Sequence, residues 1–271
     1  MNILLTNDDG IDCEGLTKFA AALREQGRHR ILVAAPELNR SGVSQSISLG
    51  GPLRLFRRSE DTWSCSGTPA DCVMAGTLGG LPVKPDLVLS GINAGPNLGT
   101  DLIYSGTAAA ARQAALHGIP GIALSLAGMP PEPLLWDSAV SFAVEKLEEL
   151  AGLWREDTFL NVNLPNISGS PLGMLITFPA VRRYNDSLIF FTAPDGSDYC
   201  FVKGGVIITE PEPGSDFDAV SRNYASLSPV FIHPVVRRDH CAPGHGFTVF
   251  RAGGKSLVQS LSAEGSVKAV K

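Results

Sequence analysis

Three short polar segments of the sequence, each containing glycine, combine oxygen-bearing side chains in a way that suits cation binding. They span residues 7–10, 39–42 and 91–97, and each follows an apolar run of the kind that forms a buried strand. Because ligands of open α/β sheets bind beyond the carboxyl ends of the strands, we expect the three segments to meet at one edge of a sheet. The candidate metal ligands in them are Asp8, Asp9, Ser41 and Asn93.

These ligands are hard oxygen atoms: two carboxylates, a hydroxyl and an amide carbonyl. They suit Mg²⁺, Mn²⁺ or Ca²⁺ better than zinc or copper, and a divalent cation relieves the repulsion between adjacent carboxylates. Taken singly, each residue has a structural explanation, because Asp8 or Asp9 could cap the next helix and Asn93 could shape a turn. The combination of both aspartates with polar loops after two other strands favours a metal site.

Ser105, Gly106 and Thr107 precede an alanine-rich run at residues 108–115. Serine or threonine in this position predicts a helix N-cap. The free N–H groups of a helix start also form a ready anion site, and this one comes soon after the segment that carries Asn93. A metal site beside a phosphate cradle indicates phosphoryl chemistry. Residues 67–71 have a similar form, which we interpret first as a helix cap and second as a substrate-lining segment.

Other chemical signatures are missing from the sequence or are weak. It contains no dinucleotide fingerprint, P-loop or G-x-S-x-G nucleophile elbow. The histidines and cysteine between residues 233 and 245 fit no zinc spacing, so we expect solvated side chains there. The pair Arg182-Arg183 is expected to be surface charge that could border an anion site.

Short apolar runs alternate with longer helix-like stretches over the first two-thirds of the chain. Near-continuous apolar runs are typical of strands covered on both faces, and their alternation with helices predicts a mostly parallel sheet between two layers of helices. The predicted strands are 3–6, 31–35, 87–90, 122–126 and 160–164, and the predicted helices include 16–23, 72–78, 108–116 and 139–150.

The pattern changes after residue 165, so we expect three regions. Residues 1–165 form the α/β core with the metal and phosphate site, 166–233 form a β-rich part, and 234–271 form a partly ordered tail. The β-rich part is predicted to contain a hairpin around the turn at 194–197. Residues 211–216, rich in proline, glycine and acids, are expected to be an exposed loop.

Composition narrows the functional classes. The chain has 271 residues, of which 44% are hydrophobic and 18% charged, so it is not a disordered chain. The formal net charge of −5 does not favour binding to a nucleic-acid polymer. The sequence offers no secretory signal and no run long enough to span a membrane, and its five scattered cysteines fit no disulfide framework. We therefore expect a cytoplasmic protein without a membrane partner.

Taken together, these motifs resemble those of the SurE family, the "survival protein" nucleotidases. The resemblance runs from the N-terminus to about residue 234, and residues 234–271 match no motif of the family. Its strongest stretches are 3–11, 35–36 with 40–42, 67–73, 90–99 and 104–107, and weaker ones are 160–165, 182–184 and 216–217.

The resemblance implies a metal-dependent phosphomonoesterase that acts on nucleoside 5′-monophosphates, often on 3′-monophosphates, and in some members on short polyphosphate. It implies that Asp8, Asp9, Ser41 and Asn93 bind the metal. The implied fold is a Rossmann-like three-layer α/β sandwich with a mostly parallel central sheet, plus a smaller C-terminal β-hairpin and oligomerisation region. A homodimer or homotetramer is expected, with C-terminal elements exchanged between subunits.

The expected mechanism is hydrolysis assisted by one divalent ion, Mg²⁺ or Mn²⁺, per subunit. We expect the phosphate to bridge this ion and the helix start at Ser105, Gly106 and Thr107, with a further hydrogen bond from Asn97. Water attacks phosphorus in line, and either Asp8 or Asp9 acts as the general base.

Two alternatives place similar residues after the first strand. An aspartyl-phosphate phosphatase needs a second acid two residues after the nucleophile, where this chain has Gly10. A phosphoryl-receiver module, which would bind without turnover, is about half as long and needs a lysine after a late strand. Residues 127–129, which follow the predicted strand at 122–126, include no lysine. Both alternatives are therefore disfavoured.

Overall fold

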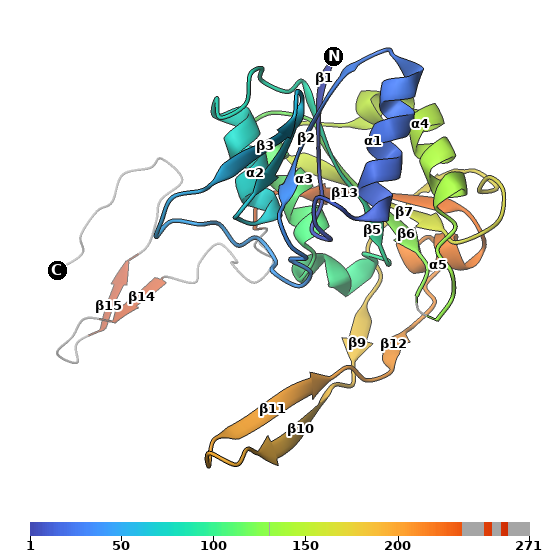
Figure 1. Cartoon of the computed structure of the whole chain (residues 1–271). Helices are drawn as coiled ribbons and strands as arrows, with labels where there is room; N and C mark the ends of the chain where they lie inside the picture. Colours follow the sequence, from blue (N-terminus) through green and yellow to red (C-terminus); the bar gives the residue numbers. More distant parts are fainter. Residues whose placement is uncertain (130, 235–246, 251–255, 260–271) are drawn as a thin grey trace. The chain divides into compact units, whose positions relative to one another are not determined.

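A nine-stranded sheet dominates the computed structural model, which describes residues 1–129, 131–234, 247–250 and 256–259 (Figure 1). The strand order across it is β3-β4-β2-β1-β5-β6-β7-β13-β8. The strands are β1 (Asn2–Thr6), β2 (Arg30–Pro36), β3 (Leu55–Ser59), β4 (Thr62–Cys65), β5 (Leu87–Ala94), β6 (Gly121–Ala127), β7 (Thr158–Pro165), β8 (Met174–Ile176) and β13 (Ala225–Phe231).

The sheet is mostly parallel, as predicted. From β4 through β2, β1, β5 and β6 to β7, every neighbouring pair of strands is parallel. The antiparallel pairs lie towards the two edges, where β3 joins β4 and β13 joins β7. The central strands are buried along nearly their whole length, which explains why they are near-continuous apolar runs in the sequence.

Helices cover both faces of the sheet, which confirms the three-layer architecture. Alternate residues of β1 enter different cores, since Ile3 and Leu5 pack on one side and Leu4 on the other. Helices α1 (Glu14–Gln26) and α4 (Trp136–Leu153) lie side by side on the first face (Figure 1). Helices α2 (Pro69–Thr77) and α3 (Gly106–Leu116) cover the other.

One glycine allows the close approach of α1 to the sheet. A Cβ atom at Gly15 would lie 2.1 Å from the carbonyl oxygen of Ile92 in β5 and 2.7 Å from the Trp136 ring. Only glycine fits between these groups. The first helix is thereby held directly over the strand whose end carries Asn93.

Residues 166–233 form part of the main sheet and also an arm that leaves it. Strands β8 and β13 extend the main sheet, whereas the other strands leave it as an arm. The arm begins with the antiparallel pair β9 (Arg182–Tyr184) and β12 (Ile207–Thr209) and ends in the predicted hairpin, β10 (Ser187–Thr192) and β11 (Asp198–Lys203) (Figure 1). All of this belongs to one compact unit, Met1–Ile232.

The expectation of an exposed loop at 211–216 is wrong at its end. Helix α5 (Asp216–Ser221) begins there, and Ser215 and Asp216 are both fully buried. The Asp216 carboxylate accepts the backbone N–H groups of Gly99 (2.8 Å) and Ala180 (2.9 Å), so this acidic residue connects buried backbone segments and is not a loop charge in solvent.

Of the second unit, His233–Lys271, the structure describes residues 233–234 and the strands β14 (Phe247–Phe250) and β15 (Ser256–Gln259), which pair antiparallel. The predicted partly ordered tail and its residues 240, 241 and 245 otherwise lie outside the described residues. In the described part of the chain, no helix combines the length and apolar character needed to cross a membrane.

Candidate active site

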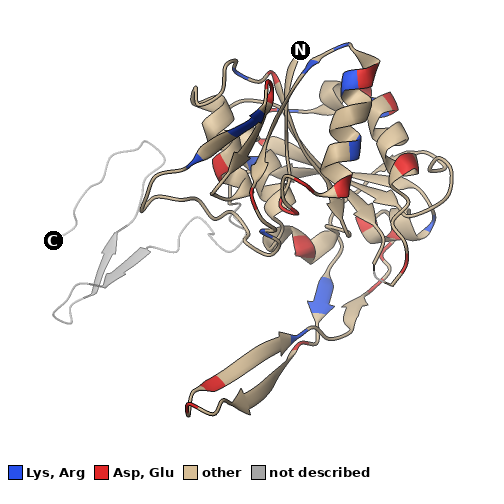
Figure 2. Ribbon diagram, in the orientation of Figure 1, with Lys and Arg blue, Asp and Glu red and all other residues tan. Residues whose placement is uncertain are grey.

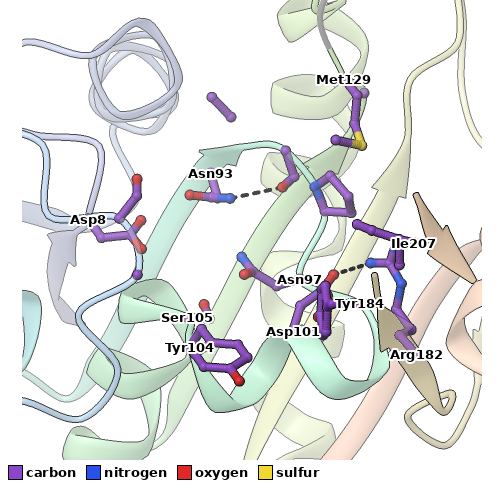
Figure 3. A pocket seen from close by; sticks show the side chains of 16 residues that line it. Asp8, Asn93, Asn97, Asp101, Tyr104, Ser105, Met129, Arg182, Tyr184 and Ile207 are labelled. Atoms are coloured by element: carbon purple, nitrogen blue, oxygen red, sulfur yellow. Dashed lines mark hydrogen bonds and ion pairs between the residues drawn. The ribbon is translucent and has the colours of Figure 1, made fainter. Parts of the chain in front are cut away.

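A cavity of about 350 Å³ opens at the carboxyl ends of β1 and β5. Asp8, Ser41 and Asn93 all line it, so three segments far apart in the sequence meet here as predicted (Figure 3). Asp9 faces a neighbouring cavity, and Ala94 lines both. Asp8 and Asp9 therefore line two neighbouring cavities that share a wall at Ala94.

The buried carboxylate of Asp8 is held by the start of α3. Its Oδ2 accepts the N–H groups of Gly106 (3.1 Å) and Thr107 (3.2 Å), and its Oδ1 accepts the Thr107 hydroxyl (2.6 Å). Burial raises the pKa of Asp8 even though these hydrogen bonds favour the ionised form. The helix N-terminus therefore orients this carboxylate without fully compensating its desolvation.

Asp9 and Asn93 complete the acidic side of the site. Asp9 Oδ2 accepts the N–H of Ala94 at 2.9 Å, and burial followed by the charge of Asp8 raises the pKa of Asp9. The Asn93 amide donates to the Gly95 carbonyl at 2.9 Å, which leaves Asn93 Oδ1 3.3 Å from the Thr107 hydroxyl, on the side that faces Asp8 (Figure 3).

This donor set fits a divalent cation. In the described part of the chain, neither aspartate forms an ion pair with a lysine, arginine or histidine, so their charge is not compensated by a side chain. Among the residues that the structure describes, no group of three or more His, Cys, Asp or Glu side chains is placed to hold a metal ion. A four-ligand set therefore needs the Ser41 hydroxyl and the Asn93 carbonyl, both hard ligands.

The start of α3 differs from the predicted free anion cradle. The N–H groups of Gly106 and Thr107 already bind Asp8, and Ser105 Oγ accepts the N–H of Ala108 at 2.9 Å, the predicted N-cap. Gly106 and Thr107 thus position a carboxylate here. Ser105 lines the cavity, and its hydroxyl proton is not used by this cap.

Asn97 is fixed in the floor of the cavity by buried polar partners. Its side-chain amide donates to Ser125 Oγ at 2.7 Å, and its backbone N–H donates to Asn163 Oδ1 at 2.8 Å. Asn161 and Asn163 both donate to its carbonyl oxygen, at 2.9 and 3.1 Å. The predicted phosphate ligand is therefore preorganised by β6 and β7.

The segment that carries Ser41 is fastened on both sides of that residue. The N–H of Arg40 donates to the Asp8 carbonyl at 2.6 Å. Ser44 donates its N–H to the Tyr104 carbonyl at 3.0 Å and its hydroxyl to the Ile103 carbonyl at 2.7 Å. These bonds hold the exposed Ser41 at the mouth of the cavity.

Sequence reasoning left most of the opposite wall of the cavity without an assigned role. Asp101, Tyr104, Arg182 and Tyr184 line it, and Figure 3 shows Tyr184 and Arg182 across from Asp8. Arg182 was expected to be surface charge that could border an anion site. It does line the cavity, but it is only 8% exposed because it forms an ion pair with Asp101. The weak resemblance at 182–184 was the available signal for this wall.

The fold and the site define an α/β protein with an oxygen-ligand site at the carboxyl edge of a parallel sheet. The family model "Survival protein SurE" matches residues 3–186, and the chain belongs to the SurE family. The protein named 5′-nucleotidase SurE from Gemmatimonas aurantiaca is 42% identical over 237 residues, covering 86% of this chain and 93% of that protein. The one from a Synechococcus species is 39% identical over 238 residues, covering 85% and 91%.

Structural similarity agrees with this assignment. The crystal structure of the SurE protein from Aquifex aeolicus superimposes with a TM-score of 0.75 at 34% identity, covering 87% of this chain and 95% of that one. The resemblance inferred from the motifs is thereby confirmed.

Proposed function

We propose that this protein is a phosphomonoesterase that hydrolyses nucleoside 5′-monophosphates with the help of one Mg²⁺ or Mn²⁺ ion per subunit. The observation that carries the proposal is the meeting of Asp8, Ser41 and Asn93 with Asn97 and Ser105 around one cavity. Its volume of about 350 Å³ lies in the range of small-molecule sites. The relatives at about 40% identity are named for this activity.

Asp8, Asp9, Ser41 and Asn93 would hold the ion, which when bound neutralises phosphate charge and acidifies water. Ser105 can donate its hydroxyl proton to a phosphate oxygen while still capping α3. Asn97 has a second amide proton beyond the one that binds Ser125. These two residues are therefore the phosphate donors in the proposed complex.

Asp9 is the better general base of the two aspartates. Both oxygens of Asp8 accept hydrogen bonds from α3, whereas Asp9 uses only Oδ2, towards Ala94. The other oxygen of Asp9 is free of hydrogen bonds within the described structure and can receive the proton of an attacking water. The same bonds at Asp8 disfavour an aspartyl-phosphate route, since that carboxylate is not free to attack.

The finer expectations belong to the same proposal. Activity on 3′-monophosphates and on short polyphosphate, the cytoplasmic location and the homodimer or homotetramer all stay predictions that rest on the sequence.

The direct test is release of inorganic phosphate from a panel of nucleoside 5′- and 3′-monophosphates under multiple turnover. We expect activity to disappear with EDTA and to return with Mn²⁺ or Mg²⁺, because the two carboxylates need a cation to bind an anionic substrate. Multiple turnover also distinguishes an enzyme from a module that only binds phosphate.

Asp9→Asn provides the matched variant, because asparagine keeps the shape and the bond to Ala94 but removes the charge. We expect weaker Mn²⁺ binding in a calorimetric titration and a fall in turnover of about 100-fold or more, the size of a lost general base. Full Mn²⁺ affinity together with full turnover in this variant contradicts the proposed roles of Asp9.

A further inference from the structure

Besides the ion pair of Asp101 and Arg182, the side of the cavity away from Asp8 carries apolar and aromatic side chains. Tyr104, Met129, Tyr184 and Ile207 line it, and they come from four different elements or loops (Figure 3). Tyr104 is 56% exposed and Met129 is 54% exposed, so both present surface to a ligand. This side of the cavity thus differs in chemistry from the acidic side.

The rings of Tyr104 and Tyr184 form an edge-to-face pair. Their centroids are 6.1 Å apart and their planes lie at 85°. In this arrangement the rings meet at a right angle, so they offer a corner in which one flat aromatic group can contact a ring face. A purine or pyrimidine base is such a group.

Asp101 holds the Tyr184 side of this corner in place. One of its carboxylate oxygens accepts the Tyr184 hydroxyl, and the other accepts Arg182 Nη1 and the N–H of Leu98, the last at 3.2 Å. The side chains of Asp101 and Arg182 are only 15% and 7% exposed. The tie therefore connects the 3₁₀ helix η1 (Gly99–Ile103) to β9 with little access for water.

Arg182 extends the same tie through the base of the arm. Its Nε donates to Thr209 Oγ1 of β12 at 3.1 Å, and its backbone N–H donates to Thr100 Oγ1 at 2.9 Å. Burial and the bond to Asp101 raise the pKa of Tyr184, which keeps its hydroxyl protonated and donating. The Asp101 carboxylate, Arg182 Nη1 and the Tyr184 hydroxyl are thus bound to one another, and the Tyr184 ring remains as surface for a ligand.

We propose that Tyr184 and Tyr104 bind the nucleobase of the substrate by ring contact, and that Asp101 is a positioning residue that holds Tyr184 in place for this contact. The proposal rests on the proposed function, since it names which part of a nucleotide this wall receives. A phosphate held near Asp8 and a base held at Tyr184 occupy opposite sides of one cavity.

The test compares AMP with ribose 5-phosphate, which carries the same phosphate and sugar but no base. Dissociation constants are measured by calorimetry with Ca²⁺, which suits the same oxygen ligands, and KM and kcat are measured with Mn²⁺. Tyr184→Ala is expected to weaken AMP binding by about 5- to 100-fold, the range for one stacked base, and to leave ribose 5-phosphate unchanged. The KM for AMP rises accordingly, whereas kcat changes little.

Two milder variants separate positioning from folding. Tyr184→Phe keeps the ring and loses only the bond to Asp101, so it should weaken AMP binding by about 2- to 10-fold. Asp101→Asn keeps the shape but cannot accept from both Tyr184 and Arg182, and it should have a similar effect on AMP alone. Tyr224→Ala is the matched control, because Tyr224 packs over Arg222 outside the cavity lining.

Parallel losses for AMP and ribose 5-phosphate in these variants overturn the proposal, because they indicate general damage to the site. A wild-type protein that binds AMP no more tightly than ribose 5-phosphate also overturns it, whether or not either compound is hydrolysed. If AMP binding depends on Tyr184 but no phosphate is released with any metal, this inference stands and the proposed hydrolytic function fails.

Discussion

At the scale of single residues, the most informative contact is the one between Asp8 and the start of α3. A helix N-terminus attracts anions, and here the anion is a carboxylate of the chain itself. The partial charge of the helix and three hydrogen bonds hold Asp8 at a defined place although burial opposes its ionisation. Helix α3 therefore contributes to the site mainly by fixing the position of the Asp8 carboxylate, and less by stabilising its charge.

Gly106→Ala tests this positioning without removing a functional group. A Cβ atom at Gly106 would lie 2.8 Å from Asp8 Cβ and 2.9 Å from Asp8 Oδ2, so the carboxylate must move. We expect nucleotidase turnover to fall about 100-fold, the effect of a displacement of about 1 Å in an active site. Steady-state phosphate release measures it.

The control is Gly152→Ala in α4, where a Cβ atom meets nothing within 4 Å. Alanine favours a helix over glycine by about 0.5–1 kcal/mol, so this variant should be fully active and no less stable. Normal turnover in Gly106→Ala would show that Asp8 tolerates displacement and that its contacts with α3 do not set the rate.

The acidic half of the site could be predicted from the sequence, and the aromatic half could not. Asp8 and Ser41 follow strands and Asn93 lies at the carboxyl end of β5, so sheet geometry alone brings them together. Tyr184 and Arg182 reach the cavity from a short pair of arm strands whose direction no periodicity encodes. The occupation of Gly106 and Thr107 by Asp8 was also hidden, because a capped helix start looks the same whichever anion it binds.

At the scale of elements, the long connection between β2 and β3 depends on the cap of α2. Asp71 accepts the N–H of Thr68 at 2.9 Å in the capping box, and it also accepts the N–H and hydroxyl of Ser48 at 2.9 and 2.7 Å. Thr68 in turn donates to the Ser46 carbonyl at 2.7 Å. One carboxylate thus starts a helix and anchors the loop that carries Ser41.

Asp71→Asn should lower the free energy of unfolding at pH 7 by about 1–3 kcal/mol, because the amide must point donors at N–H groups. Burial alone would raise the pKa of Asp71, but hydrogen bonds from Thr68 and Ser48 outweigh it and hold the pKa below its usual 3.8. A lowered pKa stabilises the fold above 3.8, and this stability is lost as the pH falls further. Urea unfolding at pH 7 and pH 3 should show the difference shrinking in acid.

Asp137→Asn is the control for this prediction, because Asp137 lies in the first turn of α4 and its side chain is 91% exposed. It removes the same charge from a helix start without breaking a buried tie. Equal losses in the two variants would mean that the charge near the helix end accounts for the effect and that the loop anchor contributes nothing.

The elements that the sequence predicts are those whose burial is uniform. The central residues of β1, β2 and β6 are mostly apolar because helices cover both faces of these strands. The edge strand β3 carries Arg57 and Arg58 and is mostly exposed, and β13 contains two serines and Pro229, so neither has an apolar pattern. Pairing with β4 and β7 determines these strands, and such pairing is not visible in local composition.

At the scale of the whole molecule, the hairpin β10–β11 is an apolar structure without a core. All twelve of its strand residues are exposed in the single chain. Phe191 stacks on Tyr199 at 5.3 Å and on Phe201 at 5.9 Å, and the charged residues lie mainly near the turn and the base (Figure 2). A two-stranded hairpin is marginally stable on its own in water, and exposed apolar surface of this kind marks an interaction site.

We therefore expect the hairpin to support the homodimer or homotetramer predicted from the sequence. Phe201 is 62% exposed and belongs to the stacked face of the hairpin, so Phe201→Glu would place a charge in the subunit contact. Light scattering after size-exclusion chromatography should show the wild-type protein at two or four times the chain mass and the variant shifted towards one chain. Ser197→Glu adds the same charge at the exposed turn and should leave the mass unchanged. A wild-type monomer, or a Phe201→Glu variant with the wild-type mass, would show that this hairpin does not hold subunits together.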